Sequence, residues 1–261
     1  MHVQASENEI VFELRWQDYL DLKQATPSLT TLRRDRIAVV SAATGDAILQ
    51  WPVYKTLVVE FERRGTRYVL TGGDWFEVDP NYARETRSIV ERHETGTLGL
   101  PGARLNESEA DYNKRACETV GARARLMDRK LFRATQSQDS IEFCDILLRP
   151  NKIVHVKRKS GSATLSHLFS QGAVSGELLH FDEGFRKLVR ESLRTGSGFS
   201  QVIRSGALKP SSYEIVFGVI APPATYNRHF LPFFSQVSFR RCAEQLTARG
   251  YTVGLERIDI A

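Results

Sequence analysis

The second half of the chain alternates helical and strand-like segments in a definite order from residue 107 onward. Residues 108–124 (SEADYNKRACETVGARA) begin with a serine that can cap a helix, carry acids in the first turn and space their apolar and small residues as a helix does. The segments that follow are three β-type runs, two helices, a strand, a helix and a strand, at residues 129–134, 140–148, 152–159, 163–179, 183–193, 213–221, 234–250 and 251–260. This order, α-β-β-β-α-α-β-α-β, predicts an α/β fold.

The first hundred residues predict a smaller α/β module that precedes this sheet. Strand-like runs and helical spacing alternate there, with strands at 8–15, 36–43 and within 56–78, and helices at 16–25 and 80–94. Gly and Pro concentrate in residues 95–105, which is typical of a linker. We therefore expect two domains, 1–103 and 104–261.

The composition is that of a folded globular protein, with 41% apolar and 26% charged residues in a chain of 261. No run approaches the roughly 18 apolar residues that a membrane helix needs, and the N-terminus shows no signal pattern. We expect a cytoplasmic protein without a membrane partner. The three cysteines, Cys117, Cys144 and Cys242, are too scattered for a disulfide framework or a CxxC zinc knuckle.

The net charge of +5 favours a polyanionic partner, because clustered Lys and Arg release counterions from phosphates. Basic runs that could follow a nucleic-acid backbone are found at residues 32–36, 62–67, 114–130 and 157–159. An unspecialised basic surface is the alternative reading of the same charge. The sequence holds no P-loop, GxSxG or RNP aromatic pattern, so NTP hydrolysis, serine hydrolysis and sequence-specific RNA recognition have no support.

Two neighbouring strand-like runs carry one acid and one lysine that can meet. The connection RPNK between 140–148 and 152–159 is short, so the two strands should be antiparallel neighbours. Strand alternation puts His155 and Lys157 on one face of the second strand, within reach of Asp145 on the first. A carboxylate suits Mg²⁺, and a bound cation with a nearby ammonium can stabilise the charge that develops at a phosphodiester.

This arrangement resembles the core of the PD-(D/E)xK nuclease superfamily over about residues 107–220. The resemblance implies a restriction-endonuclease-like mixed sheet with an αβββαβ core, and a metal-dependent nuclease that hydrolyses DNA, in preference to RNA, with Mg²⁺ or Mn²⁺. Asp145 matches the acid of the second strand, Lys157 the lysine of the third, and Glu109, or else Glu107, the acid of the first helix. The implied catalytic set is Asp145, His155, Lys157 and Glu109, with Asp145, His155 and Glu109 as metal ligands.

His155 departs from the superfamily pattern, because it stands where the triplet has Glu or Asp. An imidazole lowers the negative charge of the site and suits Mn²⁺ better than Mg²⁺. Glu142 could supply the missing acid only if a bulge interrupts its strand, since alternation puts it opposite Asp145. Glu177, from the following helix, is a further candidate. If no acid replaces His155, the protein is a catalytically inactive scaffold that binds nucleic acid or assembles a complex.

The helix at 163–179 has a polar edge that begins just after the lysine strand. Several branches of the nuclease superfamily carry a glutamine there toward the site, and Gln171 matches that placement. Ser166 and His167 lie near the helix N-terminus, where backbone N–H groups favour phosphate. With Arg158 and Lys159 of the preceding basic run, these residues form the expected nucleic-acid-binding set. A plain amphipathic packing helix is the alternative.

A closer resemblance rests on a set of motifs, SEADYN, EFCDIL, HVK and LSHLFSQG, with GDWFEV upstream. The set is similar to an uncharacterised, sporadically distributed bacterial family of mobile genomic islands. Members of that family are longer, so the resemblance implies that this chain corresponds to their C-terminal half. HVK is the usual form of the triplet in that family. The resemblance implies a role in anti-phage defence or mobile-element biology, with a protein partner from the same island or a second copy of the chain in a homodimer.

Structural roles explain the same residues without catalysis. Asp145 and Lys157 could form a buried ion pair, His155 could be a hydrogen-bonded core histidine, and Glu109 could serve its helix N-terminus. A third reading is a structural partner of another mobile-island protein, whose acidic surface the basic face would bind.

Overall fold

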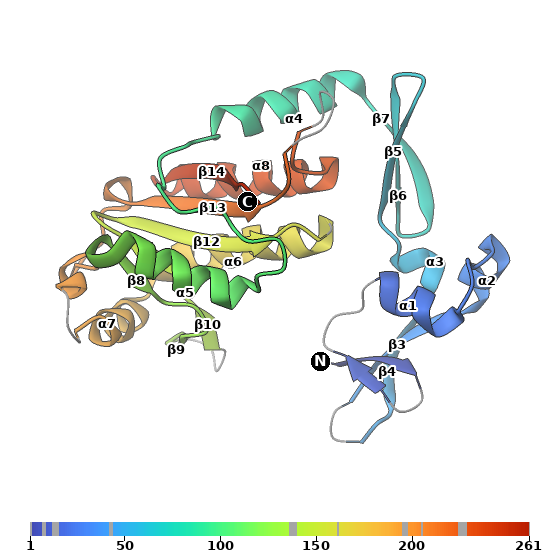
Figure 1. The fold of residues 1–261 in the computed structure, drawn as a ribbon, viewed down its shortest axis with the longest axis horizontal. Helices are drawn as coiled ribbons and strands as arrows, with labels where there is room; N and C mark the ends of the chain where they lie inside the picture. Colours follow the sequence, from blue (N-terminus) through green and yellow to red (C-terminus); the bar gives the residue numbers. More distant parts are fainter. Residues whose placement is uncertain are drawn as a thin grey trace. The chain divides into compact units, whose positions relative to one another are not determined.

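A computed structural model describes residues 2–6, 9–11, 16–41, 44–135, 140–160, 162–194, 198–204, 206–223 and 229–260 (Figure 1). The chain divides into two compact units, Met1–Tyr82 and Ala83–Ala261. Each unit combines helices with β-sheet, so the protein is of the mixed α/β class. Within the described ranges, no helix is both long enough and apolar enough to cross a bilayer.

The first unit contains two antiparallel sheets. One has the order β2-β1-β3-β4 and consists of β1 (His2–Ser6), β2 (Glu9–Val11), β3 (Arg36–Val40) and β4 (Ala47–Pro52). The other is the meander β5 (Val59–Arg63), β6 (Thr66–Thr71) and β7 (Asp74–Val78). Short helices complete the unit, namely α1 (Trp16–Lys23), α2 (Leu29–Arg34) and α3 (Val53–Thr56).

The three strands of the meander confirm the strands predicted within residues 56–78, with turns at Arg64-Gly65 and Gly72-Gly73. The strand predicted at 8–15 is β2 where the structure describes it; residues 8 and 12–15 lie outside the described ranges, as do 42–43 of the strand predicted at 36–43.

The second unit is built on a five-stranded mixed sheet in the order β14-β13-β12-β11-β8. Its strands are β8 (Ala124–Leu126), β11 (Ile146–Leu148), β12 (Lys152–Arg158), β13 (Glu214–Ile220) and β14 (Thr252–Ile258). β12, β13 and β14 are parallel, whereas β11 pairs antiparallel with both β12 and β8. The α/β class and a mixed sheet are therefore confirmed.

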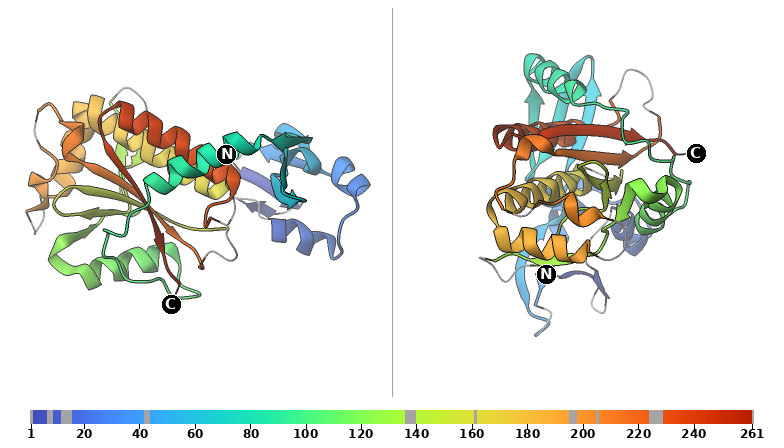
Figure 2. Two further views of the ribbon diagram at one scale, coloured as in Figure 1. Left: turned by 90° about the horizontal axis from the view of Figure 1, so that it is seen from above. Right: turned by 90° about the vertical axis from the view of Figure 1, so that its left-hand side faces the viewer.

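Helices cover both faces of this sheet (Figure 2). On one face, α6 (Ser162–Phe181), α7 (Glu183–Ser192) and α8 (Phe233–Ala248) bury a large cluster around Phe169, Phe217 and Phe239, whose rings meet edge to face at 5.3–6.0 Å. On the other face, α5 (Glu109–Val120) buries a smaller cluster that includes Tyr112 and Val154. The alternating apolar side chains of β12 and β13 feed both clusters, as strand periodicity requires.

The helix α4 (Pro80–Arg92) belongs to the second unit from Ala83 onward. Arg240 of α8 forms a 2.9 Å ion pair with Glu85, and His93 Nδ1 lies 3.0 Å from the carbonyl oxygen of Val253. Leu98, inside the segment predicted as a linker, is buried in the smaller cluster. The chain therefore divides after Tyr82, ahead of the linker predicted near residue 103.

The strands before β12 differ from the prediction. The run at 129–134 forms β9 (Leu131–Arg133), which pairs with β10 (Ser140–Glu142) and stays outside the five-stranded sheet. The place predicted for it is taken by β8, which follows α5 because the helix stops at Gly121, a residue with φ +66°. The run at 140–148 is not one strand, because the consecutive residues Phe143 and Cys144 are both fully buried and break the alternation between β10 and β11.

Gly172 of α6 lets this helix lie directly against the sheet. A Cβ on Gly172 would overlap the ring of Phe217 and approach His155 Cδ2 at 3.4 Å. We expect Gly172→Ala to lower the free energy of unfolding by about 2 kcal/mol, because an overpacked core must shift whole side chains. Chemical denaturation measures the change. Gly96→Ala is the control, since no atom lies within 4 Å of its Cβ position, and an equal loss in both variants would contradict the packing argument.

Candidate metal site

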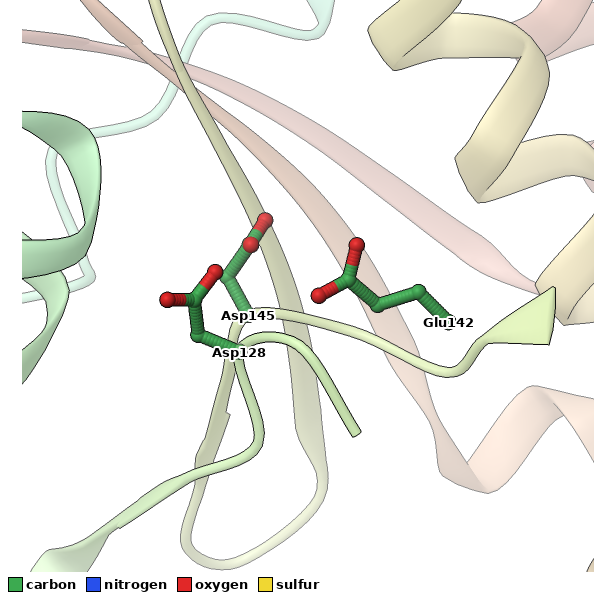
Figure 3. Close-up of side chains that lie close together, drawn as sticks. All are labelled: Asp128, Glu142 and Asp145. Atoms are coloured by element: carbon green, nitrogen blue, oxygen red, sulfur yellow. The ribbon is translucent and has the colours of Figure 1, made fainter. Parts of the chain in front are cut away.

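Three carboxylates converge at the irregular segment that separates β10 from β11. Asp128 comes from the turn after β8, Glu142 from the end of β10, and Asp145 from the residue before β11. Each offers an oxygen within 4.8 Å of the others, and Figure 3 shows Asp128 on one stretch of chain and Glu142 and Asp145 on another. Among the described residues, these three form the group that could hold a metal ion.

The backbone around Asp145 fixes its side chain beside β12. The Asp145 N–H donates to the carbonyl of Val154 at 3.0 Å, and its Oδ2 accepts the N–H of Val156 at 2.7 Å. The Asp145 carboxylate thus accepts a backbone N–H of β12 that the backbone of a longer β11 would otherwise have paired with. Its own carbonyl accepts the N–H groups of Met127 and Asp128 at 2.8 and 3.0 Å, which ties the turn after β8 to the same point.

Burial raises the pKa of Asp145 well above its ordinary value. The hydrogen bond from the Val156 N–H lowers this pKa, whereas the neighbouring carboxylates of Glu142 and Asp128 raise it. Burial also raises the pKa of Glu142, although its carboxylate accepts the Arg129 N–H and feels the positive charge of Lys157. Carboxylates held together and partly buried repel one another unless a proton or a cation lies between them. A divalent cation with oxygen ligands fits this donor set.

Lys157, near the C-terminal end of β12, forms a contact with Glu109 of α5. The Lys157 Nζ is 2.9 Å from Glu109 Oε2, and Glu109 Oε1 accepts the N–H of Arg158 at 3.0 Å. Asp145 and Glu109 therefore bond to alternate N–H groups on the same edge of β12, at Val156 and Arg158. This contact brings the predicted helix acid and the predicted lysine together.

His155 does not join the three acids. Its ring is buried under α6, where Nε2 lies 3.1 Å from Ser175 Oγ and the ring stacks on Phe217 at 5.8 Å. Burial lowers the pKa of His155 to about 4, so the ring is neutral at physiological pH. Among the described residues, the acids that lie close enough together to share a metal ion are Asp128, Glu142 and Asp145, so Asp145 is the expected ligand that belongs to this group.

The residues expected to bind nucleic acid are spread over separate contacts. Ser166 Oγ lies 2.9 Å from Ser238 Oγ and joins α6 to α8. The Arg158 guanidinium donates to the carbonyls of Arg104 and Glu107, at 3.0 and 2.8 Å, and so holds the loop before α5. His167 is exposed, while Gln171 and Lys159 are partly exposed.

The two other candidate acids serve the fold. Glu107 forms an ion pair with Arg115 at 2.6 Å, and hydrogen bonds from Arg115 lower the pKa of Glu107 to about 2. Glu177 pairs with Arg249 of the segment after α8 at 2.9 Å. Glu109 is therefore the acid of the α5 N-terminus that reaches Lys157.

Sequence reasoning missed Asp128 and set Glu142 aside. Asp128 lies in the tetrapeptide MDRK, where the Lys130 N–H closes a turn on the Met127 carbonyl at 3.0 Å. An acid between the predicted helix and the next strand-like run was the available signal, but it does not show which segment the turn will contact. Strand alternation places Glu142 opposite Asp145 unless a bulge interrupts the strand. The interruption at Phe143 and Cys144, both buried, has the same effect as such a bulge.

Comparisons with known proteins place the chain in a family and go no further. No curated protein and no solved structure matches the chain. The comparisons therefore do not show a restriction-endonuclease fold, and the resemblance to PD-(D/E)xK nucleases stays a proposal. The match that is found covers residues 2–259 and is to a family of unknown function, DUF6119. Because this match spans nearly the whole length, the protein belongs to the DUF6119 family.

Proposed function

We propose that this protein is a divalent-metal-dependent nuclease that hydrolyses phosphodiester bonds of DNA, with RNA as the alternative substrate. The observation that carries the proposal is the convergence of three carboxylates within 4.8 Å, beside a lysine held on the adjoining strand end. Carboxylates that share a cation, with a neighbouring ammonium, can catalyse metal-assisted phosphodiester hydrolysis.

Each residue has a defined task in this proposal. Asp128, Glu142 and Asp145 would hold Mg²⁺ or Mn²⁺, which supplies an acidified water and neutralises charge on the phosphate. Lys157 would donate a hydrogen bond to a phosphate oxygen or to the attacking water. Glu109 acts as a positioning residue, since its 2.9 Å contact keeps the Lys157 ammonium at the end of β12.

The distribution of charge supports nucleic acid as the partner of the second unit. Residues 83–261 hold 27 of the 36 Lys and Arg residues and 19 of the 31 Asp and Glu residues, a formal excess of eight positive charges. Residues 1–82 hold the remaining nine basic and twelve acidic residues. The unit that contains the acidic cluster is therefore the one whose net charge attracts a polyanion.

The order of elements is compatible with the resemblance to PD-(D/E)xK nucleases. A helix, α5, precedes the antiparallel strands β8, β11 and β12, and α6 then leads to the parallel strand β13. Asp145 directly precedes β11, and Lys157 lies near the end of the neighbouring strand β12, as that pattern implies. A role in anti-phage defence or mobile-element biology follows from the motif resemblance and is part of the proposal.

A catalytically inactive, nucleic-acid-binding scaffold is the second candidate. The position of His155 favours it, because the triplet residue that should be a ligand lies in the core instead. Mn²⁺ binding measured by calorimetry distinguishes the two. Saturable binding that disappears in Asp145→Asn supports the nuclease, whereas DNA binding without any Mn²⁺ binding supports the scaffold.

Cleavage assays with Mn²⁺ or Mg²⁺ test the role of Lys157. We expect Lys157→Met to lower kcat for DNA cleavage by about 100-fold, because the ammonium acts on charge that develops in the transition state. Lys187→Met is the control, since Lys187 is exposed on α7. Wild-type rates in Lys157→Met would remove Lys157 from the proposed site, and an equal loss in both variants would point to nonspecific charge.

A further inference from the structure

A strained turn lies at the acidic cluster. The turn Met127–Lys130 is closed by the Lys130 N–H on the Met127 carbonyl, and its third residue, Arg129, has φ +60°. A residue with a side chain pays about 1 kcal/mol or more for this left-handed conformation, and glycine is the usual solution at such a position. The strain at Arg129 therefore calls for a reason beyond the shape of the turn.

The backbone of the turn already serves the cluster without the Arg129 side chain. The Arg129 N–H donates to the Glu142 carboxylate, and the Asp128 N–H donates to the Asp145 carbonyl. Glycine at position 129 would keep both contacts at a lower conformational cost. The part of Arg129 that glycine cannot replace is its guanidinium.

That guanidinium faces solvent beside the acids. The Arg129 side chain is 81% exposed, and its Nε lies 3.9 Å from Asp128 Oδ2, at the outer limit of an ion pair. Such an exposed pair contributes little to stability, so it does not explain the strain. Most of the guanidinium donors are thus available to a ligand that approaches the cluster from solvent.

We propose that Arg129 binds a phosphate of the DNA backbone next to the phosphodiester that the acidic cluster acts on. The inference rests on the proposed function, since it assigns a substrate contact to that same site. A group of carboxylates repels a polyanion, so a fixed cation at its rim is needed to hold the strand near it. The planar guanidinium is suited to the task because it donates two parallel hydrogen bonds to one phosphate.

The first unit provides a matched control. Arg64 also has a left-handed backbone, with φ +53°, and stands in the exposed turn between β5 and β6. Replacement by glycine relieves the same kind of strain at both positions and removes one positive charge from each. Arg64, however, lies at a hairpin to which no acidic cluster of the described residues belongs.

The experiment measures binding of a short labelled DNA duplex to the full chain by fluorescence anisotropy, in EDTA and over a range of salt concentrations. We expect Arg129→Gly to raise Kd about 10-fold and to reduce the salt slope by about one, as the loss of one phosphate contact predicts. Arg129→Lys should restore part of the affinity, because it keeps the charge and loses the bidentate geometry. Arg64→Gly should bind as the wild type does, and both glycine variants should melt at or above the wild-type temperature.

In Mn²⁺, Arg129→Gly should raise KM by a factor similar to that in Kd, with kcat within about threefold of the wild type. Binding of Arg129→Gly within twofold of the wild type overturns the inference, and so does a failure of the wild type to bind either the duplex or its RNA equivalent. Weaker binding by Arg129→Gly alone, without cleavage in any divalent ion, supports the phosphate contact and rejects the nuclease proposal.

Discussion

Replacement of Asp145 by asparagine is expected to lower Mn²⁺-supported DNA cleavage by about 10³-fold or more while the fold remains intact. The amide oxygen of asparagine can still accept the Val156 N–H, which Asp145 Oδ2 accepts at 2.7 Å. The negative charge that would bind the cation is lost, and the proposed mechanism has no other group in its place. Gel-based cleavage assays and Mn²⁺ calorimetry measure the two effects.

The same replacement should make the metal-free protein more stable than the wild type as the pH rises. The pKa of Asp145 is raised above its ordinary value of 3.8, so the folded state holds its proton more tightly than the unfolded state does. Wild-type stability in EDTA should therefore fall as the pH rises from about 4 through the folded pKa, at about 1.4 kcal/mol for each tenfold difference in proton affinity. Asparagine does not titrate, so urea denaturation at several pH values should show a weaker dependence for Asp145→Asn.

Glu177→Gln is the matched control for both measurements. Glu177 is a carboxylate of the same unit, but it is exposed and pairs with Arg249 at 2.9 Å. Its replacement should leave cleavage and Mn²⁺ binding unchanged. Cleavage by Asp145→Asn at the wild-type rate would reject the proposed metal site.

The sequence predicts the elements of the second unit better than their junctions. Helical and strand periodicity locate α5, β12, α6, α8 and β14, because each buries an apolar face long enough to show its period. Short β8, by contrast, was not predicted, since a strand of three residues has no measurable alternation, and its first residue was assigned to the preceding helix. The break between β10 and β11 was missed for a related reason, as burial on both sides at Phe143 and Cys144 looks like a continuous apolar strand.

The candidate site depends on those junctions, which explains its partial prediction. Asp145 and Lys157 were found because they lie on adjacent strands joined by a short connection, where sequence separation limits spatial separation. Asp128 could not be found in this way, because it meets Asp145 through a turn after β8, and the pairing of β8 with β11 is not visible in the sequence. His155 shares its strand face with Lys157 by alternation, but alternation does not show that α6 covers that face at His155 and leaves it at Lys157.

The position of His155 leads to a second large expected effect. The superfamily triplet would have an acid here, so His155→Glu would restore the pattern if the residue faced the metal. In the structure the side chain lies among Ser175, Phe217 and Gly172, with 3% of its surface exposed. We expect His155→Glu to lower the free energy of unfolding by about 4 kcal/mol, because a carboxylate would be buried there without a cation.

His155→Gln separates the loss of the ring from the burial of a charge. Its amide can hydrogen-bond to Ser175, so we expect it to cost about 1–2 kcal/mol, and urea denaturation at pH 7 compares the two variants. Neither variant should alter Mn²⁺ affinity in its folded fraction, since the carboxylates that bind the ion come from Asp128, Glu142 and Asp145. If His155→Glu instead folded with wild-type stability and bound Mg²⁺ more tightly, residue 155 would face the metal site. That result would contradict the buried position of His155 in the core.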